Sequence, residues 1–448
     1  TRLQGDWSSD VCSSDLAYYK SYLGIQDMKT FKLFFNQKLV VYFFLGIASL
    51  SVWGYHTIYA QDKKPEPKKV DKKPEPKKED KKPAPKDPNA PVEIKDAVAP
   101  INVAKGTGPS FPGNDPAFLV LPKRVERSNM ARELLTPEIV EMTNKCLQYL
   151  ADSQAPNGSW SDMQYKSNSG VTALCCLAFM AEGSRPRVGK YGRHLDKGLD
   201  FLLSNVQGNG VIAAEGNNPL GPMYEHVLSS MALMFSYGDM PWRPQLQDVL
   251  AKSIQILTRS QKIDGGWRYD IAREGYADMS VTANVLWLLR TGKKAGFTVS
   301  QEQIKKGVDY IVKCAYPDGT FRYRYFGLHA SASLGGTGII AVSNNGNLDH
   351  PLVGPARDRL DYDYKRYTIQ DLLARRYYVY GCFYASVAMY STGDDYWNPW
   401  YQKATQVLKT MQRKDGEMWD EFDNTIYPTA MAAIVLLAPK GYLPIYER

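Results

Sequence analysis

Ionisable and polar side chains recur at the starts of apolar helical patterns, and these are the residues that could carry chemistry in this 448-residue chain. Glu225 and His226 stand side by side at one such start, and Asp278 stands at the next. Two carboxylates that face one cleft are what hydrolysis of a glycosidic bond requires. Tyr224, His226 and Tyr380 would instead suit a polysaccharide lyase. We therefore take four residues as candidate catalytic groups: Asp278, His226, Glu225 and Tyr380.

Further polar residues occupy equivalent positions and are expected to line the same cavity. Helix N-termini also contribute unpaired N–H groups and the positive end of the helix dipole. The cavity residues expected from the sequence, besides the catalytic candidates, are Tyr224, Ser280, Thr282, His329, Cys382, Tyr384 and Tyr427.

These positions are tied together by glycines that follow each apolar pattern about every 54 residues. Glycine adopts the left-handed conformation of a helix C-terminus without a Cβ clash, so we expect each to end a helix. A fixed period of this kind predicts copies of one helix–loop–helix unit. The six glycines are Gly183, Gly238, Gly292, Gly346, Gly393 and Gly441.

Each unit pairs an amphipathic helix, such as 191–203, with a nearly all-apolar helix, such as 171–180. The amphipathic helix buries one stripe, whereas the apolar helix must be covered on most sides. Six such pairs predict an all-α (α/α)6 toroid over 131–448, with an open solenoid as the alternative. The charged run 358–366 is interpreted as part of a solvated outer helix.

Three segments carry a family resemblance: Gln154–Trp160, Gln261–Trp267 and Gln412–Trp419. They resemble the Gln…Gly…Trp repeats of squalene–hopene cyclases and of protein prenyltransferase β-subunits, and the resemblance covers about 131–448. It implies the same toroid, in which Gln binds backbone at a helix end and Trp packs against the next unit.

The resemblance also allows the chemistry of that superfamily to be tested against the residues. Class II terpene cyclases draw a proton from Asp-x-Asp-Asp-Thr-Ala, and the matching stretch here runs from Asp278 to Ala283. Asp278 matches the first Asp, but Ser280 and Val281 replace the other two. A serine is far too weak an acid to protonate an alkene. Terpene cyclisation is therefore not expected.

Metal and cofactor chemistry is not expected either. Prenyltransferases bind zinc through Asp, Cys and His, but Cys382 and His329 lack an accompanying Asp-x-Cys pair. The Gly-Cys-Gly-Glu-Gln string of complement-type thioester toroids is absent. The cysteines of the repeat region are scattered and odd in number, so we expect buried free thiols.

Four segments are expected before the toroid. Residues 1–27 resemble non-native read-through, and 28–60 form a signal peptide or, with 39–60 retained, a membrane anchor. The Lys/Pro repeats of 61–97 predict a disordered linker, and 98–130 an extended lead-in that could plug the cavity. This order predicts an extracytoplasmic toroid.

The net charge of +8 has its largest excess in the linker, where residues 62–87 alone carry +4. Nucleic-acid binding is therefore not expected. A solvated spacer is the simplest interpretation, and attachment to an anionic envelope polymer or a membrane surface is the alternative.

Together these observations favour an exported toroid that binds an isoprenoid, glycan or peptide in its central cavity, without terpene cyclase chemistry. One alternative is a polysaccharide- or lipid-acting enzyme that uses the candidate carboxylate, His and Tyr groups. Another is a structural docking module of the cell envelope.

Overall fold

The computed structural model describes residues 133–446, except 164, 215–220 and 344–347. The predicted read-through, signal or anchor, linker and lead-in segments lie outside the described residues, as does Gly346. None of the helices within the described ranges is long and apolar enough to cross a membrane.

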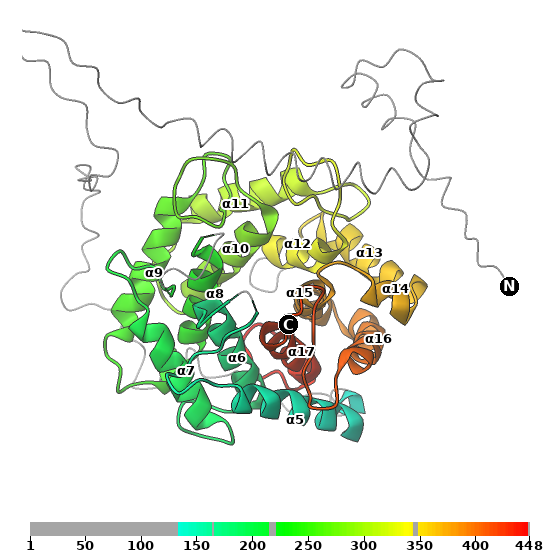
Figure 1. The fold of residues 1–448 in the computed structure, drawn as a ribbon. Helices are drawn as coiled ribbons and strands as arrows, with labels where there is room; N and C mark the ends of the chain where they lie inside the picture. The colour runs from blue at the N-terminus through cyan, green and yellow to red at the C-terminus, as the bar shows by residue number, and fades with distance from the viewer. Residues whose placement is uncertain (1–132, 164, 215–220, 344–347, 447–448) are drawn as a thin grey trace, which may run out of the picture. The chain divides into compact units, whose positions relative to one another are not determined.

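Outer and inner helices alternate along the chain (Figure 1). The outer helices are α5 (Pro137–Asp152), α7 (Gly192–Ser204), α9 (Leu246–Ser260), α11 (Gln301–Cys314), α13 (Val353–Arg366) and α16 (Asp394–Met411). The inner helices are α6 (Ser169–Glu182), α8 (Met223–Phe235), α10 (Met279–Lys294), α12 (Gly335–Val342), α15 (Tyr378–Ser391) and α17 (Ile426–Leu437). Shorter pieces complete the described fold: α14 (Ile369–Leu373) and the 3₁₀ turns η1 (Tyr237–Asp239), η2 (Ala332–Leu334) and η3 (Ala438–Lys440).

The inner helices form a closed ring. Each packs on the next, from α6 through α8, α10, α12 and α15 to α17, and α17 packs back on α6 (Figure 1). The predicted (α/α)6 toroid is therefore confirmed, and the open solenoid is excluded.

Burial follows the hydrophobic pattern that predicted the two layers. In α6, 13 of the 14 residues are buried, because neighbours surround an inner helix on all sides. In α11, only 5 of 14 residues are buried, and they form one stripe. The charged run 358–366 lies at the C-terminal end of α13 and in the outer layer, as expected. All five cysteines of the toroid are free and buried.

The glutamines of the repeat motif join neighbouring units. The Gln154 side-chain amide donates to Gly158 O within its own turn (3.0 Å) and to His194 O of α7 (2.9 Å). Gln261 does the same toward Gly265 and α11. Each glutamine therefore ties its loop to the outer helix of the next unit, as the resemblance implies.

The motif aromatics fill the space between the two layers. Trp160 and Trp267 are fully buried, and each indole N–H donates to a carbonyl near the end of the preceding outer helix, Leu150 O and Leu257 O, at 2.7 Å. In the last unit the prediction that Trp419 plays this part is wrong. Met418 occupies the equivalent buried position. The segment Gln412–Trp419 is one residue longer than the other two, and Trp419 is 38% exposed.

Met418→Ala is therefore expected to lower the free energy of unfolding by about 2 kcal/mol, because it opens a cavity in the core. Trp419→Ala is expected to change it by less than about 0.5 kcal/mol, since that ring lies at the surface. Urea unfolding of both variants checks the assignment. A larger loss in Trp419→Ala would show that Trp419 is the motif residue after all.

The glycine caps were predicted correctly at only some positions. Gly183 caps α6 with φ 112°, and Gly441 ends η3 with φ 59°. Gly238 instead lies within η1, and Gly393 precedes α16. Gly292 lies inside α10, where a Cβ would stand 2.7 Å from the Ile254 side chain, so glycine there serves close packing.

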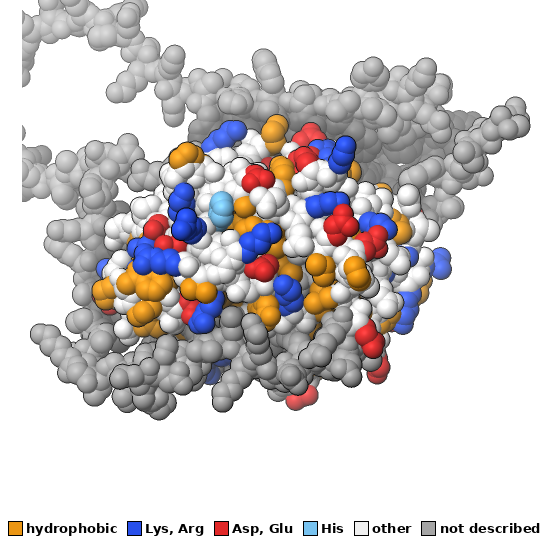
Figure 2. Space-filling model, turned by 90° about the horizontal axis from the view of Figure 1, so that it is seen from below, with side chains coloured by type: hydrophobic (Ala, Val, Ile, Leu, Met, Phe, Trp, Pro, Cys, Tyr) orange, Lys and Arg blue, Asp and Glu red, His pale blue; other side chains and the backbone are white. Residues whose placement is uncertain are grey.

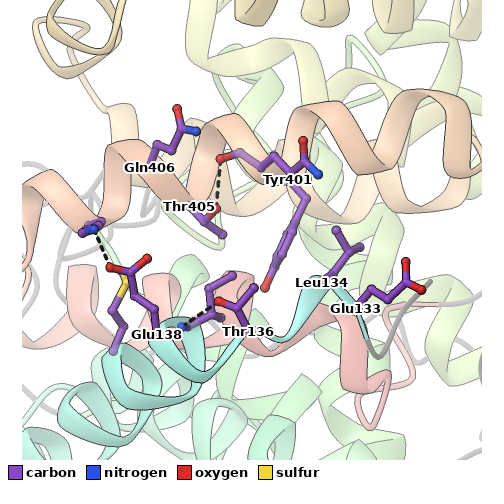
Figure 3. A pocket seen from close by; sticks show the side chains of 11 residues that line it. Glu133, Leu134, Thr136, Glu138, Tyr401, Thr405 and Gln406 are labelled. Atoms are coloured by element: carbon purple, nitrogen blue, oxygen red, sulfur yellow. Dashed lines mark hydrogen bonds and ion pairs between the residues drawn. The ribbon is translucent and has the colours of Figure 1, made fainter. Parts of the chain in front are cut away.

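The seam between the first and last units has its own contacts. Gln412 donates to Met142 O of α5 (2.9 Å), and Lys409 of α16 pairs with Glu138 of α5. Figure 3 shows the pocket of about 380 Å³ that α5 and α16 leave on the outer wall at this seam. Amphipathic outer helices border this pocket, and the inner-helix entrances lie elsewhere.

Candidate functional site

The N-terminal turns of the inner helices and the loops before them enclose a central cavity of about 700 Å³. That volume lies within the range of small-molecule sites. Aromatic side chains dominate its wall: Tyr165, Tyr224, Tyr269, Tyr323, Tyr377, Tyr380, Tyr384, Tyr427 and Phe422. Among the described residues, no lysine, arginine or histidine lines it.

The cavity tyrosines are neutral hydrogen-bonding groups. Tyr269 and Tyr323 share a hydrogen bond between their hydroxyls at 2.6 Å, and the Tyr384 hydroxyl donates to Asn284 Oδ1 at 2.6 Å. Burial raises the pKa of Tyr224 and of Tyr380, as it does for the other buried phenols of the wall. None of these buried phenols is therefore prepared to act as a general base near neutral pH.

Glu225 is the acidic residue that lines the cavity, and its carboxylate stabilises a helix terminus. Its Oε2 accepts the N–H of Ser169, the first residue of α6, at 2.9 Å, and the N–H of Ala214 at 3.2 Å. The side chain is 1% exposed. A carboxylate at a helix N-terminus is favoured by the unpaired N–H groups and the helix dipole, which gives Glu225 a structural task.

Asp278 lies behind the wall, not on it. It caps α10: its Oδ1 accepts the N–H of Val281 (2.9 Å) and the hydroxyl of Ser280 (2.7 Å), and Ser280 lines the cavity. Its Oδ2 is buried without a hydrogen-bond partner. Burial raises the pKa of Asp278 to about 6, and the bonds from Val281 and Ser280 lower it less.

His226 is held between backbone groups away from the cavity. Its Nδ1 accepts the Ile212 N–H (3.1 Å), and its Nε2 lies 3.0 Å from Ser253 O, to which it donates in that tautomer. Burial lowers the pKa of His226 to about 4. In three other units a threonine hydroxyl accepts the equivalent N–H, as Thr282 does from Trp267 at 2.9 Å. His226 therefore has the structural role that a threonine has in those three units.

The structure places the eleven predicted site residues in two groups. Six line the cavity: Tyr224, Glu225, Ser280, Tyr380, Tyr384 and Tyr427. Five do not: Asp278, His226, Thr282, His329 and Cys382. His329 is exposed, whereas Cys382 is buried inside α15.

Helix rotation explains this division. In α6 and α8 the second, third and sixth residues face the cavity, as Tyr224, Glu225 and Leu228 do in α8. In α10 and α17 the second residue, Ser280 or Tyr427, also lines it. The fourth residue points toward the motif loop, and that is the position of His226 and Thr282. Side chains one position apart on a helix face directions about 100° apart, so neighbours in sequence reach different surroundings.

Several wall residues were missed because they lie in the loops. Tyr269 and Tyr323 each follow a buried motif aromatic by two residues, at Trp267 and Phe321. Their carbonyls accept the first N–H of the inner helix of the preceding unit; Tyr269 O, for example, lies 2.9 Å from Met223 N. Their spacing from the repeat motif was the signal that could have found them. Tyr377 and Phe422 carry no such signal.

Metal ligands do not gather in the part of the chain that the structure describes: no three His, Cys, Asp or Glu side chains form a cation site there. The described residues thus form an aromatic cavity with hydroxyl and amide groups, and the one carboxylate among them that lines it, Glu225, already caps a helix.

The comparisons with known proteins agree with the fold. The chain resembles a cellobiose 2-epimerase from Bacillus thermoamylovorans, with a TM-score of 0.52 and 12% identity over 67% of this chain and 98% of that one. It also matches the type II terpene cyclase MstE from Scytonema in complex with geranylgeranyl dihydroxybenzoate (TM-score 0.45, 12% identity, 70% and 99% covered). A possible member of the GH105 family from Salmonella enterica is a third match (TM-score 0.46, 12% identity, 69% and 94% covered).

No protein-family model and no curated protein matches the chain. At such low identity the structural likeness defines the fold alone. The class of protein that fold and site define is an (α/α)6 toroid with an aromatic central cavity.

Proposed function

We propose that this toroid binds a short, uncharged saccharide in its central cavity and does not hydrolyse it. The observation that carries the proposal is the wall itself, in which eight tyrosines surround a volume of about 700 Å³. Tyrosine offers an apolar ring face for the C–H side of a sugar and a hydroxyl for its polar edge. The predicted export of the chain is compatible with a saccharide ligand and stays a prediction.

The charge of the wall supports an uncharged ligand. A diphosphate or carboxylate headgroup is normally bound by Arg or Lys, and neither lines the described cavity. Three inner helices already bind a protein carboxylate at their N-termini: α6 binds Glu225, α10 binds Asp278 and α17 binds Asp162. An anion would therefore find these three helix ends already occupied and an acidic side chain in the wall.

The carboxylates argue against hydrolysis. A glycosidase uses two carboxyl groups that reach opposite sides of the scissile bond. Here Glu225 reaches the wall but is bound to two backbone N–H groups, and Asp278 lies behind Ser280. The arrangement supports binding of a saccharide without cleavage.

Isothermal titration of the full chain with cellotriose, maltotriose, a galacturonic acid trimer and farnesol tests the proposal. We expect a dissociation constant in the micromolar range for a neutral trisaccharide, and at least tenfold weaker binding of the anionic trimer. Chromatography after overnight incubation should return the trisaccharide intact. Tight binding of farnesol with no response to either neutral sugar would replace the saccharide by an isoprenoid.

One observation favours an enzyme as the second candidate. Asp278 combines a pKa of about 6 with a buried, unpartnered Oδ2, which are properties of a general acid or base. It lies behind the wall, so a proton would pass between Asp278 and a saccharide through the hydroxyl of Ser280. If the protein turns over a saccharide in the same assay, Asp278→Asn should abolish turnover while trisaccharide binding persists. Turnover that survives in Asp278→Asn would remove Asp278 from the mechanism.

A further inference from the structure

Backbone strain in the described residues is concentrated around one side of the central cavity. Four non-glycine residues have positive φ: Ser167, Arg187, Tyr377 and Asp423. Tyr377 lines the cavity, Ser167 precedes the lining residue Asn168, and Asp423 stands between the lining residues Phe422 and Asn424. The left-handed conformation is costly for a residue with a Cβ, and such residues cluster at functional sites.

The strained segments belong to the fifth, sixth and first units, which are neighbours around the ring. Tyr377 has φ 58° and ψ 36°, and its N–H donates to Glu421 Oε1 at 2.7 Å. Its ring lies 5.7 Å from the ring of Phe422, with Arg376 over both rings at 5.0 and 5.7 Å. Contacts with Glu421 and Phe422 of the sixth unit and with Arg376 hold Tyr377 in its strained conformation.

A hydrogen-bond acceptor without a partner lies in the loop of Phe422, two residues further along the chain. Asn424 is 1% exposed and lines the cavity, and its Nδ2 donates to both Asp420 oxygens, at 3.3 and 3.1 Å. Those bonds orient the amide so that Oδ1 is the remaining polar atom, and it is buried without a partner. A buried carbonyl of this kind requires a donor, which a ligand could bring.

We infer that Tyr377, Phe422 and Asn424 form the subsite that recognises one sugar ring of the ligand. This inference rests on the proposed saccharide binding and gives it a location. The sugar stacks on the Tyr377–Phe422 pair, and one of its hydroxyls donates to Asn424 Oδ1. The strained backbone at Tyr377 places an aromatic ring where an unstrained residue would not present it.

Variants at Tyr377 separate recognition from folding. Tyr377→Ala keeps the unfavourable backbone conformation and removes the ring, whereas Tyr377→Gly removes the ring and relieves the strain. We expect both to bind cellotriose or maltotriose, whichever the wild-type chain binds better, about tenfold more weakly. Tyr377→Gly should nevertheless melt about 2 °C above Tyr377→Ala. Tyr377→Phe should bind within about threefold of wild type, because the ring remains.

Arg187 supplies the matched control. It has φ 67° but lies in the turn before α7, with its guanidinium over Trp242 at 4.3 Å and away from the cavity wall. Arg187→Gly should likewise melt above Arg187→Ala, and both should bind as wild type does. A fully O-methylated trisaccharide, which can stack but cannot donate, should fail to bind.

The outcomes are distinguishable. If Tyr377→Gly recovers affinity together with stability, Tyr377 only holds its loop and the subsite is wrong. Wild-type affinity in Tyr377→Ala, or tight binding of the O-methylated sugar, would overturn the inference as well. A wild-type chain that binds no neutral sugar contradicts the proposed function itself, before any variant is compared.

Discussion

Asp162→Ala is expected to lower the free energy of unfolding by about 4 kcal/mol, because it removes a buried carboxylate that joins the first unit to the last. The Asp162 carboxylate lies in the loop of the first unit and caps α17 in the last. It accepts the N–H groups of Thr425 (2.8 Å), Ile426 (2.8 Å) and Tyr427 (2.9 Å). Only 5% of Asp162 is exposed, so water would not easily replace these bonds.

The size of the effect follows from the number and kind of bonds. Each hydrogen bond to a charged group contributes about 1.5 kcal/mol or more, and buried donors left unsatisfied add to the loss. Burial raises the pKa of Asp162 although four backbone N–H groups favour its charged form. The desolvation of the carboxylate therefore offsets part of the gain, and about 4 kcal/mol allows for it.

Urea unfolding followed by tryptophan fluorescence measures this loss. Thr136→Ala is the matched control, because Thr136 caps the outer helix α5 through one bond to Ile139 N (3.3 Å). That variant should lose only about 1 kcal/mol. Hydrogen exchange in Asp162→Ala should rise first in α17 and α6, which meet at the seam. Equal losses in the two variants would mean that Asp162 stabilises the fold no more than an ordinary helix cap does.

Asp278→Asn is expected to stabilise the protein by about 3 kcal/mol at neutral pH and to leave it unchanged near pH 4. Burial raises the pKa of this carboxyl from 3.8 to about 6, and that difference corresponds to about 3 kcal/mol. The native state prefers the protonated carboxyl, so the raised pKa of Asp278 favours folding at low pH. This contribution is lost as the pH rises from about 4 to about 6.

Asparagine suits this comparison because it keeps the Oδ1 acceptor for Val281 N–H and carries no charge. Unfolding of both proteins should be measured from pH 4 to pH 7, and the difference between them isolates Asp278 from groups that titrate in the same range, such as His226. The difference should grow from near zero to about 3 kcal/mol. A difference that stays constant with pH would show that the pKa of Asp278 is not raised.

The fold could be read from the sequence because its signals are local and repeated. Amphipathic and apolar helices alternate with a regular period, and the Gln…Gly…Trp turns recur between them. The incorrect predictions also concern single positions within these segments. The period predicts a helix end at Gly292, but this residue lies inside α10, and the chain reverses at Gly296, whose φ is 87°. The motif predicts Trp419 as its buried aromatic residue, but Met418 fills that space.

The site could be predicted only in part, and His226 shows why. Its position at an inner-helix entrance was recognised correctly, but the direction of its side chain was not. Thr172, Thr282 and Thr429 occupy the same fourth position and bind the motif loop through their hydroxyls. This recurrence was present in the sequence and would have marked His226 as structural.

By itself, the sequence determined the number of units, their layers and the end of the ring at which polar residues gather, because hydrophobic period and turn chemistry are properties of short segments. The tertiary structure alone decided which side chains face the cavity, how the carboxylates are engaged and which loops meet. Those properties depend on the rotation of each inner helix and on contacts across the seam, such as the bond between Asp162 and Thr425, 263 residues apart. The contact between Tyr377 and Phe422 also depends on the tertiary structure, since no local pattern encodes it. The same holds for the buried oxygen of Asn424.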